Sequence, residues 1–115
     1  KSHMGAPHRN LVDFAHVPVI KRLTRMPVCV DPSHSVGSRE RAPDGLLEIQ
    51  HAAAQGVIAG ANMVLADVHP HPDRALVDGP QALYLEELDD FAEDLTVVRQ
   101  AYESRRRLAE GRARP

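Results

Sequence analysis

The chain alternates short apolar runs with longer amphipathic stretches, and this alternation predicts an α/β fold. Residues 28–30 and 63–66 are short, apolar and partly β-branched, as the buried strands of a parallel sheet are. Residues 14–23 and 46–59 have helical periodicity, and Gly60 is placed to end the second of these helices. The order of helix, strand, helix, strand and helix predicts a βαβ crossover with a helix on either side.

The longest predicted helix spans residues 84–108. Its apolar side chains recur at spacings of four and three residues and form a narrow seam: Tyr84, Leu88, Phe91, Leu95, Val98 and Tyr102. Two explanations stay open, because the seam can dock on the chain's own sheet or be shared with a second chain. Residues 1–4 are expected to be a cloning remnant and residues 109–115 a flexible tail, which leaves residues 5–108 as one domain.

Polar motifs follow both predicted strands, at the ends where α/β folds place their chemistry. These motifs are Asp31-Pro32-Ser33-His34, Asp67-Val68-His69-Pro70 and, soon after, Asp78-Gly79-Pro80-Gln81. We expect His34, Asp67 and Asp78 to meet at one rim. One imidazole and two carboxylates suit Mn²⁺, Fe²⁺ or Zn²⁺, with His69 or His71 as a fourth donor.

Two metal-free interpretations of the same residues stay open. His34 can form an acid–base pair with Asp67 or Asp78, in which the carboxylate fixes the imidazole tautomer. The three side chains can equally be a relic that is only hydrogen-bonded or solvated. Asp31 has a structural alternative of its own, because its carboxylate can cap the loop that follows.

Candidate substrate-binding residues are Arg39, Arg41 and His69. Both arginines lie in the polar, glycine-containing loop of residues 35–45, where a guanidinium can grip a substrate carboxylate or phosphate. The alternative for the two arginines is a solvent-exposed loop without a ligand.

Composition limits the classes of partner. The 115 residues carry a formal net charge of −2 and only 3% aromatic residues, so neither a nucleic acid nor a membrane surface is an expected partner. A lone cysteine, Cys29, excludes an internal disulfide and fits a reducing cytoplasm; in its apolar run it is expected to be a buried hydrophobe. No apolar run reaches the roughly 20 residues that span a bilayer, and no signal peptide is expected.

Several multi-residue motifs resemble one enzyme family, in that family's order and over most of residues 9–95. They are Val17-Pro18-Val19-Ile20-Lys21-Arg22-Leu23-Thr24, then Asp31-Pro32-Ser33-His34-Ser35-Val36-Gly37, then Val68-His69-Pro70, Pro72-Asp73-Arg74-Ala75-Leu76 and Asp78-Gly79-Pro80-Gln81-Ala82-Leu83. The family is the class I 3-deoxy-heptulosonate 7-phosphate (DAHP) synthases with the related 3-deoxy-octulosonate 8-phosphate synthases. The resemblance implies a TIM (β/α)₈ barrel that condenses phosphoenolpyruvate with an aldose phosphate, often with a divalent metal.

The resemblance covers only the end of such a barrel, from its sixth helix to its eighth. In the family a cysteine, the histidine of Asp-Pro-Ser-His, a glutamate before Val-His-Pro and the aspartate of Asp-Gly-Pro-Gln hold the metal. His34 and Asp78 match, Asp67 replaces the glutamate, and the cysteine has no equivalent because Cys29 lies within a predicted strand. The parental condensation is therefore not expected of this chain alone.

A sheet of only two strands exposes apolar side chains to water. Met63, Leu65, Asp67 and His69 share one face, so an open pair of strands would leave apolar side chains and both strand edges in water. We therefore predict a homo-oligomer, a dimer or larger, that covers this face and places the active site near the interface.

The functional hypothesis is a repurposed DAHP-synthase-like enzyme of secondary metabolism. It would act on a carbonyl-bearing, oxygenated small molecule by elimination, hydration, hydrolysis or cyclisation, with His34 as acid–base group or metal ligand. Two other hypotheses stay open: a non-catalytic binding or regulatory remnant, and one piece of a split synthase.

Overall fold

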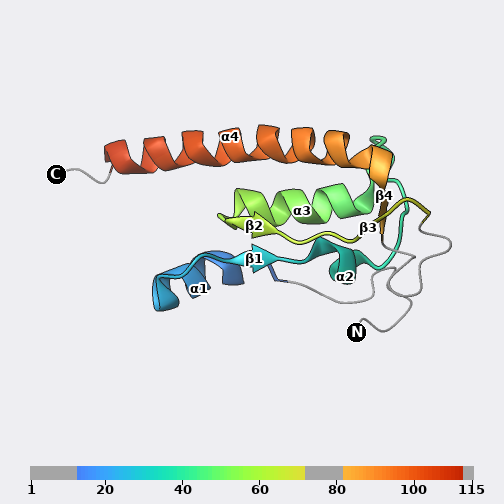
Figure 1. Cartoon of the computed structure of the whole chain (residues 1–115). Coiled ribbons are helices and arrows are strands. Elements are labelled where there is room, and N and C mark those ends of the chain that lie inside the picture. Colours follow the sequence, from blue (N-terminus) through green and yellow to red (C-terminus); the bar gives the residue numbers. More distant parts are fainter. Residues whose placement is uncertain (1–12, 72–81, 113–115) are drawn as a thin grey trace.

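The computed structural model describes residues 13–71 and 82–112 (Figure 1). Its elements, in chain order, are α1 (His16–Thr24), β1 (Cys29–Val30), α2 (Pro32–Val36), α3 (Glu48–Ile58), β2 (Met63–Val64), β3 (Val68–His69), β4 (Leu83–Tyr84), the 3₁₀ turn η3 (Leu85–Glu87) and α4 (Leu88–Arg112). Among the described residues, no helix combines the length and the apolar character needed to cross a bilayer.

The predicted βαβ crossover is confirmed. β1 and β2 pair in parallel, with Cys29 opposite Met63 and Val30 opposite Val64, and α3 connects them. A second parallel pair, β3 with β4, was not predicted. It joins residues 68–69 to residues 83–84, and beside it the Asp67 carbonyl accepts the Leu83 N–H at 2.8 Å. A local hydrophobic pattern does not reveal such a pairing.

α1 and α3 lie within two residues of the predicted helices, whereas the differences are larger at residues 32–36 and at both ends of the last helix. Residues 32–36 form the short helix α2, although they were assigned to a strand end and a loop. α4 begins at Leu88, because Tyr84 is extended and belongs to β4. The helix then continues to Arg112, so residues 109–112 are helical and the predicted tail is wrong there.

The main core lies between α3, α4 and the strands. It contains Leu47, Ile49, Ala53, Leu83 and Phe91, with Val64, Ala66 and Leu95 packed against it. Phe91 and Leu95 belong to the predicted seam, and α4 lies along α3 (Figure 1). At least this part of the seam therefore docks on the chain itself.

Close packing of α3 on β1 depends on one glycine. A Cβ atom at Gly56 would lie 2.7 Å from Cγ2 of Val30, which is closer than real Cβ contacts allow. The missing side chain therefore lets the helix approach the strand.

β2 is shorter than the strand predicted for residues 63–66, but together with the extended residues 65–67 after it, it has one covered and one open face. Val64 and Ala66 pack against the core, whereas Met63 is 61% exposed and Leu65 is 56% exposed. The alternation expected from the sequence is confirmed. The apolar face that would line a barrel is uncovered in the single chain.

Candidate functional site

The Asp-Pro-Ser-His motif folds as the beginning of α2, directly after β1. Asp31 is the N-cap, and its Oδ1 accepts the backbone N–H of His34 at 3.2 Å. Pro32 occupies the first helical position, where no backbone N–H is needed. The helix ends after one turn at Gly37, whose φ of 74° suits glycine. The local sequence thus fixes where the histidine side chain begins.

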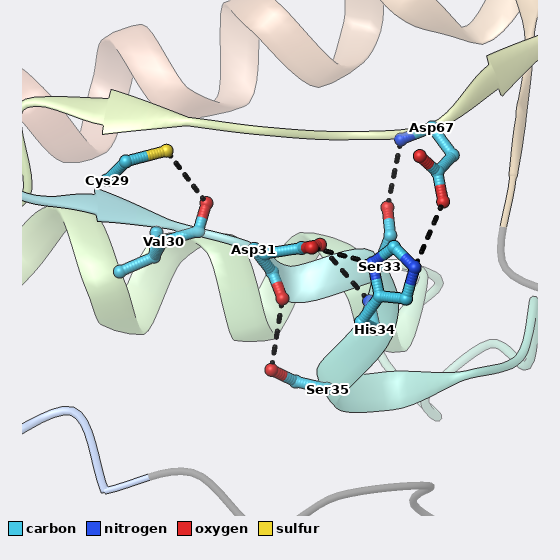
Figure 2. A network of polar contacts seen from close by, with 7 residues as sticks. All are labelled: Cys29, Val30, Asp31, Ser33, His34, Ser35 and Asp67. Carbon is cyan, nitrogen blue, oxygen red and sulfur yellow. Dashed lines mark hydrogen bonds and ion pairs between the residues drawn. The ribbon is translucent and has the colours of Figure 1, made fainter.

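Asp31 also binds the imidazole of His34. Its Oδ2 lies 2.6 Å from Nδ1 of His34 (Figure 2). Because an ionised carboxylate only accepts hydrogen bonds, Nδ1 carries the proton and Nε2 keeps its lone pair in the neutral ring. The pair therefore presents a basic nitrogen on the far side of the ring.

Asp67 lies on that far side. Its Oδ2 is 3.9 Å from Nε2 of His34, and this oxygen is buried without a hydrogen-bond partner among the described residues. The backbone of Asp67 is held by Ser33, which is 0% exposed and whose Oγ accepts the Asp67 N–H at 3.1 Å. The turn after β1 and the segment after β2 are therefore tied together at the site.

Two donors for a divalent cation face each other at this place. Nε2 of His34 and Oδ2 of Asp67 are the donor types that Mn²⁺, Fe²⁺ and Zn²⁺ accept, and Asp31 orients the imidazole as carboxylates behind metal-bound histidines do. The unpartnered oxygen of Asp67 is the observation that favours a cation. Within residues 13–71 and 82–112, no group of three or more His, Cys, Asp or Glu side chains is placed to hold one. Asp78, the third predicted ligand, lies outside the described residues.

Arg39 is engaged by the protein itself. Its Nη1 donates to the Ala82 carbonyl at 2.7 Å, its Nη2 donates to Glu87 at 2.9 Å, and the guanidinium lies 4.4 Å from the centre of the Tyr84 ring. Burial opposes the ionisation of Glu87, but the hydrogen bonds from Arg39 and from the Tyr84 N–H hold its pKa below the ordinary value. These contacts hold Arg39 in place, and its role toward a substrate stays a prediction.

The other two predicted substrate-binding residues make local contacts. Arg41 donates to the Gly45 carbonyl at 2.6 Å. Nδ1 of His69 accepts the backbone N–H of His71 at 2.8 Å, which forms a turn after β3. Within the part of the chain that the structure describes, no hydrogen bond or ion pair joins these side chains to Asp31 or Asp67. Their roles toward a substrate stay predictions.

The expectation that Cys29 is a buried hydrophobe is wrong, because the thiol is exposed. Its Sγ lies 3.7 Å from the Val30 carbonyl (Figure 2), and its register partner is the exposed Met63. The open face thus includes both strands of the pair.

The capping role expected of Asp31 is confirmed, although the capped element is the helix α2. The contact of Asp31 with the His34 ring and the bond of Ser33 to Asp67 were not predicted. For Asp31 a signal was present, since an N-cap aspartate three residues before a histidine can reach both the backbone N–H and the ring. For Ser33 none was present, because its partner Asp67 is 34 residues away.

Two parallel strands joined by a crossover helix, with polar side chains at their carboxyl ends, define a partial TIM barrel. The chain belongs to the DAHP synthetase I family, whose model matches residues 2–104. Because this match includes residues 2–4, the assignment of residues 1–4 to a cloning remnant stays a prediction.

Relatives of known activity are aldolases. The phospho-2-dehydro-3-deoxyheptonate aldolase of Thermotoga maritima is 36% identical over 87 residues, which are 76% of this chain and 24% of the relative. The 2-dehydro-3-deoxyphosphooctonate aldolase of Desulfosudis oleivorans is 36% identical over 95 residues, which are 79% of this chain and 34% of the relative.

The fold agrees with these relatives. A solved truncated form of the 3-deoxy-D-arabino-heptulosonate 7-phosphate synthase of Thermotoga maritima superposes with a TM-score of 0.72 at 30% identity. The match covers 87% of this chain and 36% of that structure. The chain thus spans a quarter to about a third of the length of its relatives.

Proposed function

We propose that this chain supplies the His34 side of a DAHP-synthase-like active site, which acts on a carbonyl-bearing, oxygenated small molecule. The observation that carries the proposal is the arrangement of His34 between two carboxylates, Asp31 on Nδ1 and Asp67 facing Nε2. Both carboxylates follow the carboxyl ends of neighbouring parallel strands, the rim at which this fold class binds substrates.

As an acid–base group, His34 uses Nε2. The lone pair accepts a proton from a carbon next to a carbonyl or from a hydroxyl group, and Asp31 keeps the ring in the required tautomer. The negative charge of Asp67 stabilises the imidazolium that results, which then returns the proton to a leaving oxygen. Elimination, hydration, hydrolysis and cyclisation all use this pair of proton transfers.

As a metal site, the same atoms serve as ligands. Nε2 of His34 and Oδ2 of Asp67 would hold the ion, and Asp31 would orient the ring. A bound divalent cation supplies the polarisation of a substrate carbonyl oxygen.

The names of the relatives suggest the class of substrate. Phosphorylated 3-deoxy sugar acids combine a carbonyl, hydroxyl groups and a phosphate. The proposal also places the reaction of this site in secondary metabolism. The parental condensation requires the rest of the barrel, because this chain corresponds to at most 36% of the solved relative.

A second candidate function is one piece of a split aldolase. The exposure of Met63 and Leu65 favours it, since these side chains occupy the face that a complete barrel encloses. The chain is a non-catalytic remnant if replacing His34 changes neither metal binding nor turnover.

The test compares His34→Gln and Asp31→Asn with a matched control, His51→Gln. His51 also pairs with an aspartate, Asp44 at 2.7 Å, but lies on α3 away from the site. Affinity for Co²⁺ is measured by visible absorption, and turnover of a phosphorylated 3-deoxy sugar acid is measured with and without Mn²⁺. A parallel series of the same measurements adds the part of the Thermotoga maritima aldolase that precedes the segment matched by this chain.

We expect His34→Gln to lower Co²⁺ affinity or turnover at least 100-fold. Asp31→Asn should lower the same quantity, Co²⁺ affinity or turnover, about 10- to 100-fold, because the imidazole loses the carboxylate that orients it. His51→Gln should equal the parent chain. Equal metal binding and equal turnover in His34→Gln and the parent would overturn the proposal and favour the non-catalytic remnant.

A further inference from the structure

Two separate segments carry the two halves of the candidate site. His34 belongs to α2, whereas Asp67 directly precedes β3. The 3.9 Å between Nε2 of His34 and Oδ2 of Asp67 therefore depends on the contacts that join these segments. Ser33 supplies one such contact through its bond to the Asp67 N–H (Figure 2). Because rotation about a single hydrogen bond stays free, a second contact is needed to fix the distance.

Arg39, on the segment that follows α2, makes the second contact. Its Nη1 donates to the Ala82 carbonyl at 2.7 Å, and its Nη2 donates to Oε2 of Glu87 at 2.9 Å. The guanidinium also lies 4.4 Å from the centre of the Tyr84 ring, as in a cation–π pair. These partners belong to β4, to η3 or to the residue before them. One side chain thus binds the β4 segment at three points.

β4 carries this contact to Asp67. It pairs in parallel with β3, with Val68 opposite Leu83, and the Leu83 N–H donates to the Asp67 carbonyl at 2.8 Å. Ala82 is 2% exposed and Leu83 is 1% exposed, and Leu83 packs in the main core. Close packing of this kind transmits a shift instead of absorbing it. A displacement at Arg39 is therefore passed on to the backbone of Asp67.

Glu87 holds the guanidinium of Arg39 in its orientation. Oε1 of Glu87 accepts the Tyr84 N–H at 2.7 Å and Oε2 accepts from Arg39, so the carboxylate itself is fixed at the beginning of the last helix. The Arg39 side chain is 26% exposed and that of Glu87 is 22% exposed. Partial burial limits the competition from water, so this pair holds its geometry better than an ion pair on the open surface.

We propose that Arg39 is a positioning residue that sets the separation between His34 and Asp67. It ties the segment of His34 to β4, which is bonded to the backbone of Asp67. The proposal rests on the proposed function, because the separation matters only where both side chains act on one ion or one proton. It differs from the sequence prediction that Arg39 grips the substrate. Only a positioning role changes the site before any substrate is added.

Arg39→Met removes the guanidinium and keeps an apolar stem in its place. We expect it to lower Co²⁺ affinity about 3- to 30-fold without substrate, at a temperature far below Tm, as changes within a coupled network do. For a metal-free site, kcat should fall by the same factor while KM stays constant. The Leu83 amide should exchange about tenfold faster, and the ¹⁵N–¹H signal of Asp67 should move. Arg106→Met, which breaks the 3.4 Å pair with Glu103 on α4, is the matched control and should change none of these quantities.

The readouts separate positioning from the other roles of Arg39. The proposal is overturned if His34→Gln lowers Co²⁺ affinity or kcat and Arg39→Met lowers neither. A rise in KM alone would assign Arg39 to the substrate, and a loss of stability alone would make it merely structural. If Arg39→Met does not fold, Arg39→Lys, which keeps the charge without the planar fork, should show the same losses. If His34→Gln equals the parent in both quantities, the proposed function fails, and the Asp67 signal alone decides whether Arg39 positions this residue.

Discussion

Replacing Ser33 by alanine removes one part-buried hydrogen bond and almost no volume. Ser33 is 0% exposed, and its Oγ accepts the Asp67 N–H at 3.1 Å. Because Ser33 itself is closed to solvent, we expect the Asp67 N–H to lose its partner without a replacement by water. An unsatisfied buried donor costs about 1–3 kcal/mol of unfolding free energy. For a domain of this size that is a fall in Tm of about 4–12 °C.

Ser35→Ala is the matched control, because it also deletes a serine hydroxyl from α2. The Ser35 hydroxyl donates to the Asp31 carbonyl at 3.1 Å, but the residue is only half-buried and water can take its place. Its loss should cost less than about 1 kcal/mol. Urea unfolding gives both free energies, and the ¹⁵N–¹H spectrum reports the Asp67 amide.

This prediction is refuted when Ser33→Ala destabilises the protein no more than Ser35→Ala does, although the Asp67 amide signal moves. In that case the bond exists, but burial does not make it costly. An unmoved Asp67 signal would show instead that the bond is absent in solution. Where the bond holds, its loss should also loosen Asp67 relative to His34 and weaken Co²⁺ binding.

The remaining predictions concern one glycine and one ion pair. Gly60→Ala should lower the free energy of unfolding by about 1–3 kcal/mol, because φ is 109° and the new Cβ would lie 3.0 Å from the Tyr102 hydroxyl. Gly111→Ala, in open space on α4, should raise the free energy of unfolding by up to about 1 kcal/mol. Equal effects at the two sites in thermal unfolding would contradict this prediction. Glu87 has a pKa below its ordinary 4.5, so the stability that it gains from Arg39 is complete above about pH 4.5 and is lost as the pH falls through its folded-state pKa. The stability difference between the parent chain and Glu87→Gln should therefore shrink in acid urea titrations, and a difference that stays constant down to pH 2 would refute the assignment.

The sequence determined the local elements and their chemistry. Strand and helix periods gave the βαβ order, and alternation along residues 63–67 gave the face that carries Met63, Leu65 and Asp67. The motif Asp31-Pro32-Ser33-His34 placed a histidine at the carboxyl end of a strand. These features depend on side-chain period and turn chemistry within a few residues, so they can be read without neighbours.

Tertiary structure decided which distant groups meet. The pairing of β3 with β4, the bond from the Asp67 amide to Ser33 and the contacts of Arg39 with Glu87 all join segments more than ten residues apart. No local pattern specifies these partners, because each depends on how the crossover brings the two strands together. The same packing left the Cys29 thiol exposed, beside the exposed Met63 of the neighbouring strand.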